Sequence, residues 1–123
     1  MPPDTLQLGA IAHARSGDKG NHANIGVVAY TPAGFDYLQK TLTAELVRDY
    51  FAGLGVSQVE RFELPLVGAL NFLLYDALGG GASRSLRIDT QGKLLGTAIE
   101  EMEIPCPVHW AELLPPATGT NAR

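Results

Sequence analysis

The stretch Arg15-Ser16-Gly17-Asp18-Lys19-Gly20-Asn21-His22-Ala23-Asn24-Ile25-Gly26 joins two apolar segments of this chain. It brings together basic side chains, a carboxylate, amide and imidazole groups, and glycines. A short hairpin turn needs only a pair such as Asn-Gly or Asp-Gly. The composition of the stretch therefore predicts a loop of about eight residues that binds a ligand or carries catalytic groups.

Both flanking segments have the pattern of strands. Between Leu6 and Arg15, apolar residues occupy every second position, which is the periodicity of a strand. His13 and Arg15 fall on its other face, so the strand would direct both side chains to one side, beside the loop. Residues 25–30 are rich in β-branched residues and predict a second strand.

The next segment predicts two short helices followed by a strand. Thr31 can cap the first helix with Pro32 at its first position, and Thr43 can cap the second. Gly53 and Gly55 would end the helical segment. Residues 58–64 then predict a third strand, which stops at Pro65.

The second half of the chain predicts another helix, a strand and a last helix. From Gly68 to Leu78, apolar residues recur at helical spacing, and the three glycines at 79–81 would terminate this helix. Residues 85–89 predict the fourth strand and residues 94–102 the last helix, with a strand beginning near Met102 as the alternative.

This order of elements predicts an α+β fold. It implies a four-stranded, mostly antiparallel sheet with helices on one face. The other face would be wet, oligomeric or covered by a larger subunit, so we expect an oligomer component. We expect one domain at residues 1–114 and a flexible C-terminal tail at 115–123, which begins with Pro115-Pro116.

Composition excludes several classes of protein. A chain of 123 residues is long enough for one domain with its own core. Its formal net charge of −4 argues against nucleic-acid binding, which needs a basic surface. The single cysteine excludes an internal disulfide framework and fits a reducing compartment. Without a signal-like start or an apolar run of membrane-spanning length, the expected location is cytoplasmic, with no membrane contact.

Beyond these patterns, the chain resembles a known family. Arg-Ser-Gly-Asp-Lys-Gly at residues 15–20, followed by Asn-Ile-Gly-Val at 24–27, resembles the opening motif of the small ferredoxin-fold domain of AtuA-like proteins, the acyclic terpene utilisation family. The resemblance covers residues 6–104. It continues in the segments 42–47, 51–53, 59–65, 68–74, 77–81 and 83–87. It implies a ferredoxin-like two-layer sandwich and, because the domain follows a much larger domain in many relatives, a separately encoded AtuA-like large subunit as partner.

The predicted loop offers an anion site. Arg15 and Lys19 flank backbone N–H groups freed by Gly17 and Gly20, which could form a nest for a phosphate, a carboxylate or a thioester oxyanion. The alternative is an ion-paired loop that only holds the hairpin. The candidate substrate-binding residues here are Arg15, Ser16, Gly17, Gly20 and Asn24.

Asp18 is the carboxylate we consider for general acid or base work, because Lys19 or Arg15 could tune it and stabilise negative charge. His13 and His22 are alternatives, since imidazole titrates near neutral pH. The candidate catalytic residues are therefore Asp18, Lys19 and His13. In the competing interpretation, these side chains are solvated or hold the local structure.

Other candidates lie further along the chain. Gly80 and Arg84 could grip a carboxylate or phosphate, although a helix terminator followed by a surface arginine explains them equally well. Asn71 interrupts an apolar run and could hydrogen-bond a loop or face a cavity. Cys106 and His109 form a conceivable nucleophilic pair, but a structural cysteine is the simpler explanation. No histidine or cysteine spacing indicates a metal, and we expect no cofactor.

Two classes of function stay open. In the first, the chain is the small subunit of an AtuA-like complex that acts on acyl-CoA thioesters, as a hydratase or lyase, in isoprenoid or branched-acid catabolism. The resemblance implies this setting, and the anion-holding loop beside a carboxylate suggests the reaction type. In the second, the chain is a non-catalytic assembly or stabilising module for the larger partner.

Overall fold

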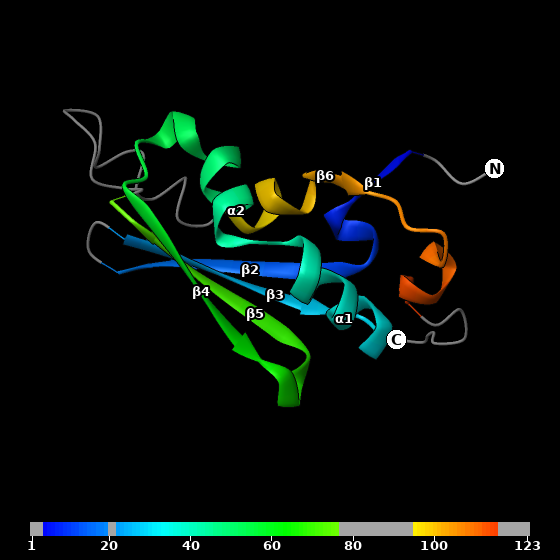
Figure 1. The fold of residues 1–123 in the computed structure, drawn as a ribbon. Helices are drawn as coiled ribbons and strands as arrows, with labels where there is room; N and C mark the ends of the chain where they lie inside the picture. Colours follow the sequence, from blue (N-terminus) through cyan, green and yellow to red (C-terminus); the bar gives the residue numbers. More distant parts are fainter. Residues whose placement is uncertain (1–3, 20–21, 77–94, 116–123) are drawn as a thin grey trace.

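The computed structural model describes residues 4–19, 22–76 and 95–115. Its centre is a four-stranded antiparallel sheet with the order β2-β3-β5-β4. These strands are β2 (Ala12–Lys19), β3 (His22–Ala29), β4 (Gln58–Leu64) and β5 (Ala69–Tyr75). The described helices all lie on one side of this sheet (Figure 1). The predicted fold class, a ferredoxin-like α+β sandwich of two layers, is confirmed.

The prediction of a long loop after Arg15 is wrong. β2 and β3 form one hairpin whose pairing continues from Ala12 opposite Ala29 to Lys19 opposite His22. The predicted strand from Leu6 to Arg15 is also divided, because a 3₁₀ turn at Leu8–Ala10 separates β1 (Thr5–Gln7) from β2. The prediction took the many polar residues of this stretch as evidence for a loop. In an antiparallel strand, however, polar residues can occupy every second position, on the exposed face.

The helix predicted from Gly68 to Leu78 is likewise wrong, because residues 69–75 form strand β5. Leu70, Phe72 and Leu74 are fully buried, and the residues between them are only partly buried. Burial at every second position is strand periodicity. Leu73 on the opposite face made the same run match helical spacing. The predicted Gly79–Gly81 terminator and the 85–89 strand lie outside the described residues.

Both capped helices are confirmed, as is the strand that follows them. α1 (Pro32–Thr41) begins after Thr31, whose hydroxyl accepts a hydrogen bond from the Gly34 N–H at 2.9 Å. α2 (Ala44–Tyr50) begins after Thr43, whose hydroxyl accepts one from the Leu46 N–H at 3.1 Å. Each hydroxyl satisfies an N–H group that has no partner within the helix.

Residues 95–100 form a helix on the same side of the sheet as α1 and α2, over β2. The Ser16 hydroxyl accepts a hydrogen bond from the Gly96 N–H at 2.8 Å, and the Ala14 N–H donates to the Glu100 carboxylate at 2.7 Å. The predicted helix at 94–102 is confirmed over residues 95–100. The alternative of a strand near Met102 is also realised, because β6 (Glu103–Pro105) follows this helix.

The core lies between the sheet and the helices. On the sheet it consists of Ala12, Ala23, Ile25, Val27, Leu70, Phe72 and Leu74. The helices and connections contribute Leu8, Ile11, Phe35, Leu38, Leu42, Val47, Phe51, Leu95, Ile99, Met102, Ile104 and Leu113. β1 and β6 form a separate two-stranded antiparallel sheet that brings the two ends of the domain together (Figure 1).

Candidate functional site

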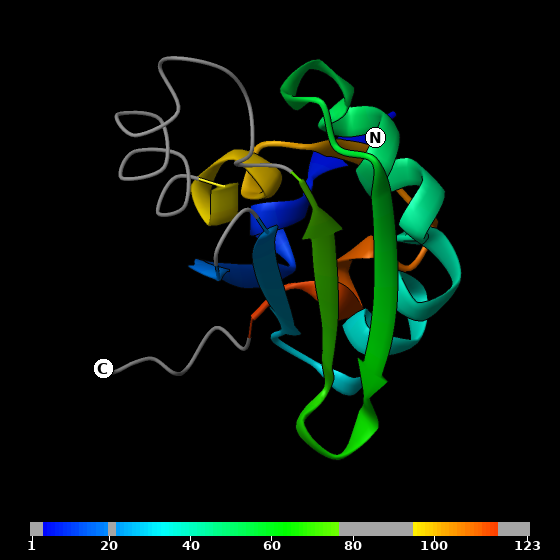
Figure 2. The ribbon, with the colours of Figure 1, turned by 90° about the vertical axis from the view of Figure 1, so that its left-hand side faces the viewer.

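The candidate site is the sheet face that none of the described helices covers, which we call the open face. Figure 2 looks onto this face, with the helices behind β4 and β5. Three rows of residues cross it from β2 to β4. They are His13, Val28, Ala69 and Leu64; Arg15, Gly26, Asn71 and Phe62; and Gly17, Asn24, Leu73 and Glu60.

Two glycines leave bare backbone on the β2–β3 half of the open face. Gly26 pairs with Arg15 and Gly17 with Asn24, so the glycines lie on neighbouring rows. Neither has a positive φ. A Cβ atom at Gly26 would meet only the Asn71 Oδ1 atom, at an ordinary 3.8 Å, and one at Gly17 only the Asn24 Oδ1 atom, at 3.3 Å. Neither backbone conformation nor internal crowding therefore requires glycine at position 26, and glycine inside a strand often marks close approach of another molecule.

Polar side chains border this bare patch. The Asn24 Nδ2 group donates a hydrogen bond to the Asn71 Oδ1 atom at 3.2 Å. The Arg15 side chain is exposed, and in the part of the chain that the structure describes no carboxylate forms an ion pair with it. The described ion pair joins Arg61 and Glu63 instead. The patch therefore presents a cation and amide groups that a carboxylate, phosphate or thioester oxygen could bind.

The β4 half of the open face has the opposite character. Phe62 and Leu64 are 45% and 47% exposed, although both are large and apolar. They project on the same side as Leu73, which is partly buried. Isolated apolar residues are normal on surfaces, whereas grouped ones mark interaction sites.

At the end of the sheet, three side chains form a connected group. The Tyr75 hydroxyl donates a hydrogen bond to the Glu60 carboxylate at 2.6 Å, and the Tyr75 ring meets His22 edge-on at 5.0 Å between centroids. His22 Nδ1 accepts a hydrogen bond from the Asp76 N–H at 3.0 Å. The hydrogen bond to Glu60 raises the pKa of Tyr75, with smaller contributions from desolvation and the Glu60 charge. This bonding assigns Glu60 a structural role.

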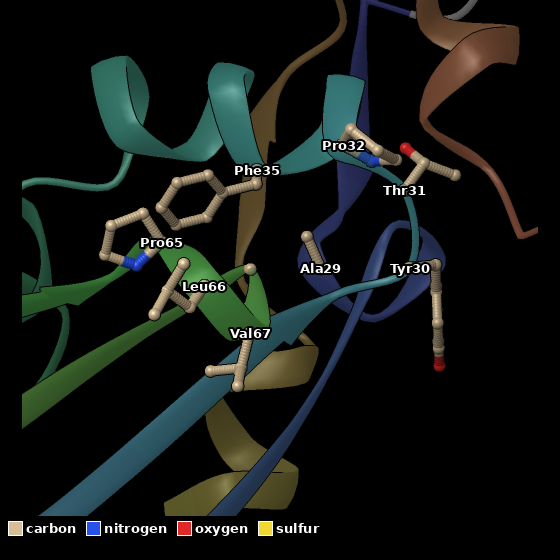
Figure 3. A pocket seen from close by; sticks show the side chains of 9 residues that line it. Ala29, Tyr30, Thr31, Pro32, Phe35, Pro65, Leu66 and Val67 are labelled. Carbon is tan, nitrogen blue, oxygen red and sulfur yellow. The ribbon is translucent and has the colours of Figure 1, made fainter.

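A shallow pocket of about 320 Å³ lies at the other end of the sheet. Figure 3 shows Phe35 of α1 beside Pro65 and Leu66, which belong to the turn between β4 and β5, whereas Tyr30 points away from them. The Tyr30 ring lies 5.9 Å from the His13 ring between centroids. The pocket is lined mainly by apolar residues, and none of its lining residues is a carboxylate, a histidine, a lysine or a cysteine.

Only some of the predicted site residues lie on the open face. His13, Arg15, Gly17, Asn24 and Asn71 share it. Ser16 lies on the helix side, bonded to Gly96. Gly17 is in a strand without a positive φ, so the predicted nest at this residue is wrong. Gly20, Gly80 and Arg84, and the side chains of Asp18 and Lys19, lie outside the described residues.

Sequence reasoning missed two parts of the site. Gly26 carried a usable signal, since a glycine within a β-branched strand is unusual. The exposure of Phe62 and Leu64 carried none, because their alternation matched that of the other strands. Only the pairing of Phe62 with Asn71 and of Leu64 with Ala69 on β5 shows which face they occupy.

The structure does not join Cys106 to His109. The Cys106 thiol lies 3.8 Å from the Pro107 carbonyl oxygen, and the His109 ring meets Tyr37 edge-on at 6.2 Å between centroids. Within the described ranges, no group of three or more His, Cys, Asp or Glu residues could hold a metal ion. None of the helices in those ranges is long and apolar enough to cross a membrane.

Comparison with known proteins gives a family match. The family model for the AtuA ferredoxin-like domain matches residues 6–105. This range contains every strand of the main sheet and all of the described open face. No curated protein and no solved structure matches the chain.

Proposed function

Because this chain belongs to the AtuA ferredoxin-like domain family, we propose that it is a small subunit that binds a larger AtuA-like chain in the cytoplasm. The observation that carries this proposal is the open face, where exposed Phe62 and Leu64 lie beside a bare patch bordered by Arg15. Apolar side chains with one cation at the margin are typical of a protein interface. The family supplies the expected partner.

Affinity capture of the tagged chain from native extract tests this proposal, with mass spectrometry to identify a large AtuA-like chain in equal amount. The complex is then rebuilt from purified chains and its dissociation constant measured. We expect Leu64→Asp to weaken binding tenfold or more, on the order of 1.4 kcal/mol or above, because it places a charge in the interface.

Val108→Asp is the matched control, because Val108 is 94% exposed and lies after β6, away from the open face. It should bind like the parent chain. Capture of no AtuA-like chain, or equal weakening by the two aspartates, would refute the proposal.

A second candidate function is catalytic, and the cation at the bare patch favours it. In this version the assembled complex acts on acyl-CoA thioesters as a hydratase or lyase in isoprenoid or branched-acid catabolism. Arg15 and Asn71 of the open face would hold the carbonyl oxygen. Asp18 alternates with the open-face positions of β2, so it would act as general acid or base from the adjoining end of the β2–β3 hairpin. Coverage by the partner would exclude water, which strengthens electrostatic stabilisation of the transition state.

Turnover of acyl-CoA thioesters by the rebuilt complex tests this candidate. Asp18→Asn should lower kcat by about a hundredfold or more, the usual effect of losing a general acid or base. Arg15→Gln should lower kcat/KM while assembly is retained. If Asp18→Asn complexes turn over at the parental rate, Asp18 has no catalytic role and only the binding function stands.

A further inference from the structure

The open face is unevenly shaped, and its two halves complement each other. The β4 half carries the large exposed side chains of Phe62 and Leu64. The β2–β3 half has the bare backbone of Gly17 and Gly26. We propose that the purified chain, without its larger partner, forms a dimer in which the open faces of two copies pack together around a twofold axis parallel to the strands.

This axis places the projecting half of one copy over the bare half of the other. A rotation about an axis along the strands brings β2 over β4 of the second copy and β3 over its β5. It keeps each row at the same height, so the row with Arg15 and Gly26 faces the row with Asn71 and Phe62. Facing sheets pack about 10 Å apart. In this register Asn71 of the second copy lies opposite Gly26, and Phe62 of the second copy lies opposite Arg15, one strand away from Gly26.

Charge favours the same arrangement. Arg15 stands at one margin of the open face and Glu60 at the opposite margin, one row away. In the dimer, Arg15 lies opposite Phe62 of the second copy and next to its Glu60. A guanidinium over an aromatic ring contributes about 0.5–1 kcal/mol at exposed sites and more when desolvated. The twofold axis makes this contact twice.

The other axis that lies in the plane of the face is unfavourable. An axis perpendicular to the strands would place β2 over β2 and β4 over β4. The two Arg15 side chains would then approach each other, and like charges repel. Bare glycine backbone would face bare glycine backbone and leave a gap, which forfeits dispersion contacts.

The small size of the face predicts a weak dimer. Four strands at about 4.8 Å spacing and three rows give a flat area of about 300–500 Å² per copy. A standard stable interface buries about 800 Å² per partner. We therefore expect association at tens to hundreds of micromolar, and displacement of the second copy by any larger chain that binds the same face.

Sedimentation equilibrium of the purified chain between about 1 and 500 µM tests the dimer. We expect a reversible monomer–dimer equilibrium, and at least tenfold weaker association for Gly26→Val. Valine suits a strand and its Cβ would have only an ordinary contact at 3.8 Å, so the variant should fold while filling the hollow. Phe62→Ser should weaken association similarly. Leu66→Ser is the matched control, because Leu66 is fully exposed in the turn beyond β4.

Cross-linking tests the direction of the axis, in a Cys106→Ser background with a bismaleimide that spans the roughly 10 Å between packed sheets. A mixture of Arg15→Cys and Phe62→Cys chains should cross-link, whereas either variant alone should not. A chain that stays monomeric at 500 µM, an undiminished dimer of Gly26→Val, or cross-linking of Arg15→Cys alone would overturn the proposal. These measurements use one purified chain, so their failure is separate from failure to capture a larger partner.

Discussion

A single hydroxyl group links strand β5 to the edge strand β4 on the open face. The Tyr75 hydroxyl on β5 donates to Glu60 on β4. Because the neutral phenol makes this hydrogen bond and phenolate cannot donate it, the pKa of Tyr75 is raised. The pKa of Tyr50 is raised too, first by burial and then by the Glu101 charge.

These shifts predict how stability depends on pH. A folded-state pKa above the usual tyrosine value of about 10 means that the folded chain holds the proton more tightly than the unfolded chain. The contribution is therefore complete below about pH 10 and is lost as the pH rises through the folded-state pKa. Urea unfolding at about pH 9, 10 and 11 should show a falling free energy of unfolding, with a shallower fall for Tyr75→Phe.

Glu60→Gln provides the companion variant, because it keeps the Tyr75 ring and removes the carboxylate acceptor. It should also reduce the pH dependence. Parental slopes in both variants would mean that the Tyr75–Glu60 bond is not formed in solution.

The sequence predicted the face of a single side chain correctly only where the secondary structure of its segment was also predicted correctly. His13 and Arg15 were correctly assigned to one face, since both lie in one regular strand. Ser16 and Gly17 were assigned to a shared anion site, but consecutive strand residues point to opposite faces. The expectation failed because it treated these residues as a loop.

At the scale of elements, the helix at 95–100 is fixed by its close approach to β2. A Cβ atom at Gly96 would lie 3.2 Å from the Ala14 carbonyl oxygen and from two backbone atoms of Arg15. These are backbone atoms, so they cannot move aside as the end of a side chain can. A side chain at position 96 would therefore require the helix and β2 to move apart by a few tenths of an ångström.

Gly96→Ala should consequently lower the free energy of unfolding by about 1–3 kcal/mol, the usual cost of overpacking. Gly53→Ala is the control, because a Cβ atom at Gly53 would meet nothing within 4 Å and Gly53 has no positive φ. It should be neutral or stabilise by up to about 1 kcal/mol. Urea unfolding of both variants measures the difference, and equal stability would show that the helix is not held at this distance.

Helices and strands could be predicted from the sequence where one local pattern favoured a single kind of element. Thr31-Pro32 and Thr43 gave the helix starts, because a capping hydroxyl acts locally. The segment at 69–75 could not be resolved, because apolar residues on both faces satisfy a helical stripe and a strand at once. Only pairing with β3 and β4, which lie far away in sequence, decides between them.

At the scale of the whole molecule, the C-terminal segment completes the core. Met102 is 3% exposed, and Ile104 and Leu113 are fully buried. The Leu8 N–H also donates to the Met102 carbonyl at 2.8 Å. Each buried side chain of this size contributes about 1.5–3 kcal/mol, so the three together rival the total stability of about 5–15 kcal/mol usual for a domain.

A chain that ends at residue 101 should therefore not fold cooperatively, whereas one that ends at residue 115 should unfold like the full chain. Circular dichroism with urea unfolding distinguishes the two outcomes. A cooperative transition of the shorter chain at the parental midpoint would show that the core closes without this segment. The second truncation also tests the proposed domain boundary at residue 114.

The pairing of β1 with β6 also has a consequence for folding kinetics. Its side-chain bond joins Thr5 to Glu103, which are 98 positions apart in the chain. Closing so long a loop has a large entropic cost, and proteins rich in such distant contacts fold slowly. The β2–β3 and β4–β5 hairpins need no distant partner and can form in about 1–10 µs. We therefore expect the strand pair at the chain ends to form last. A nascent chain cannot make it until the ribosome has released residue 105.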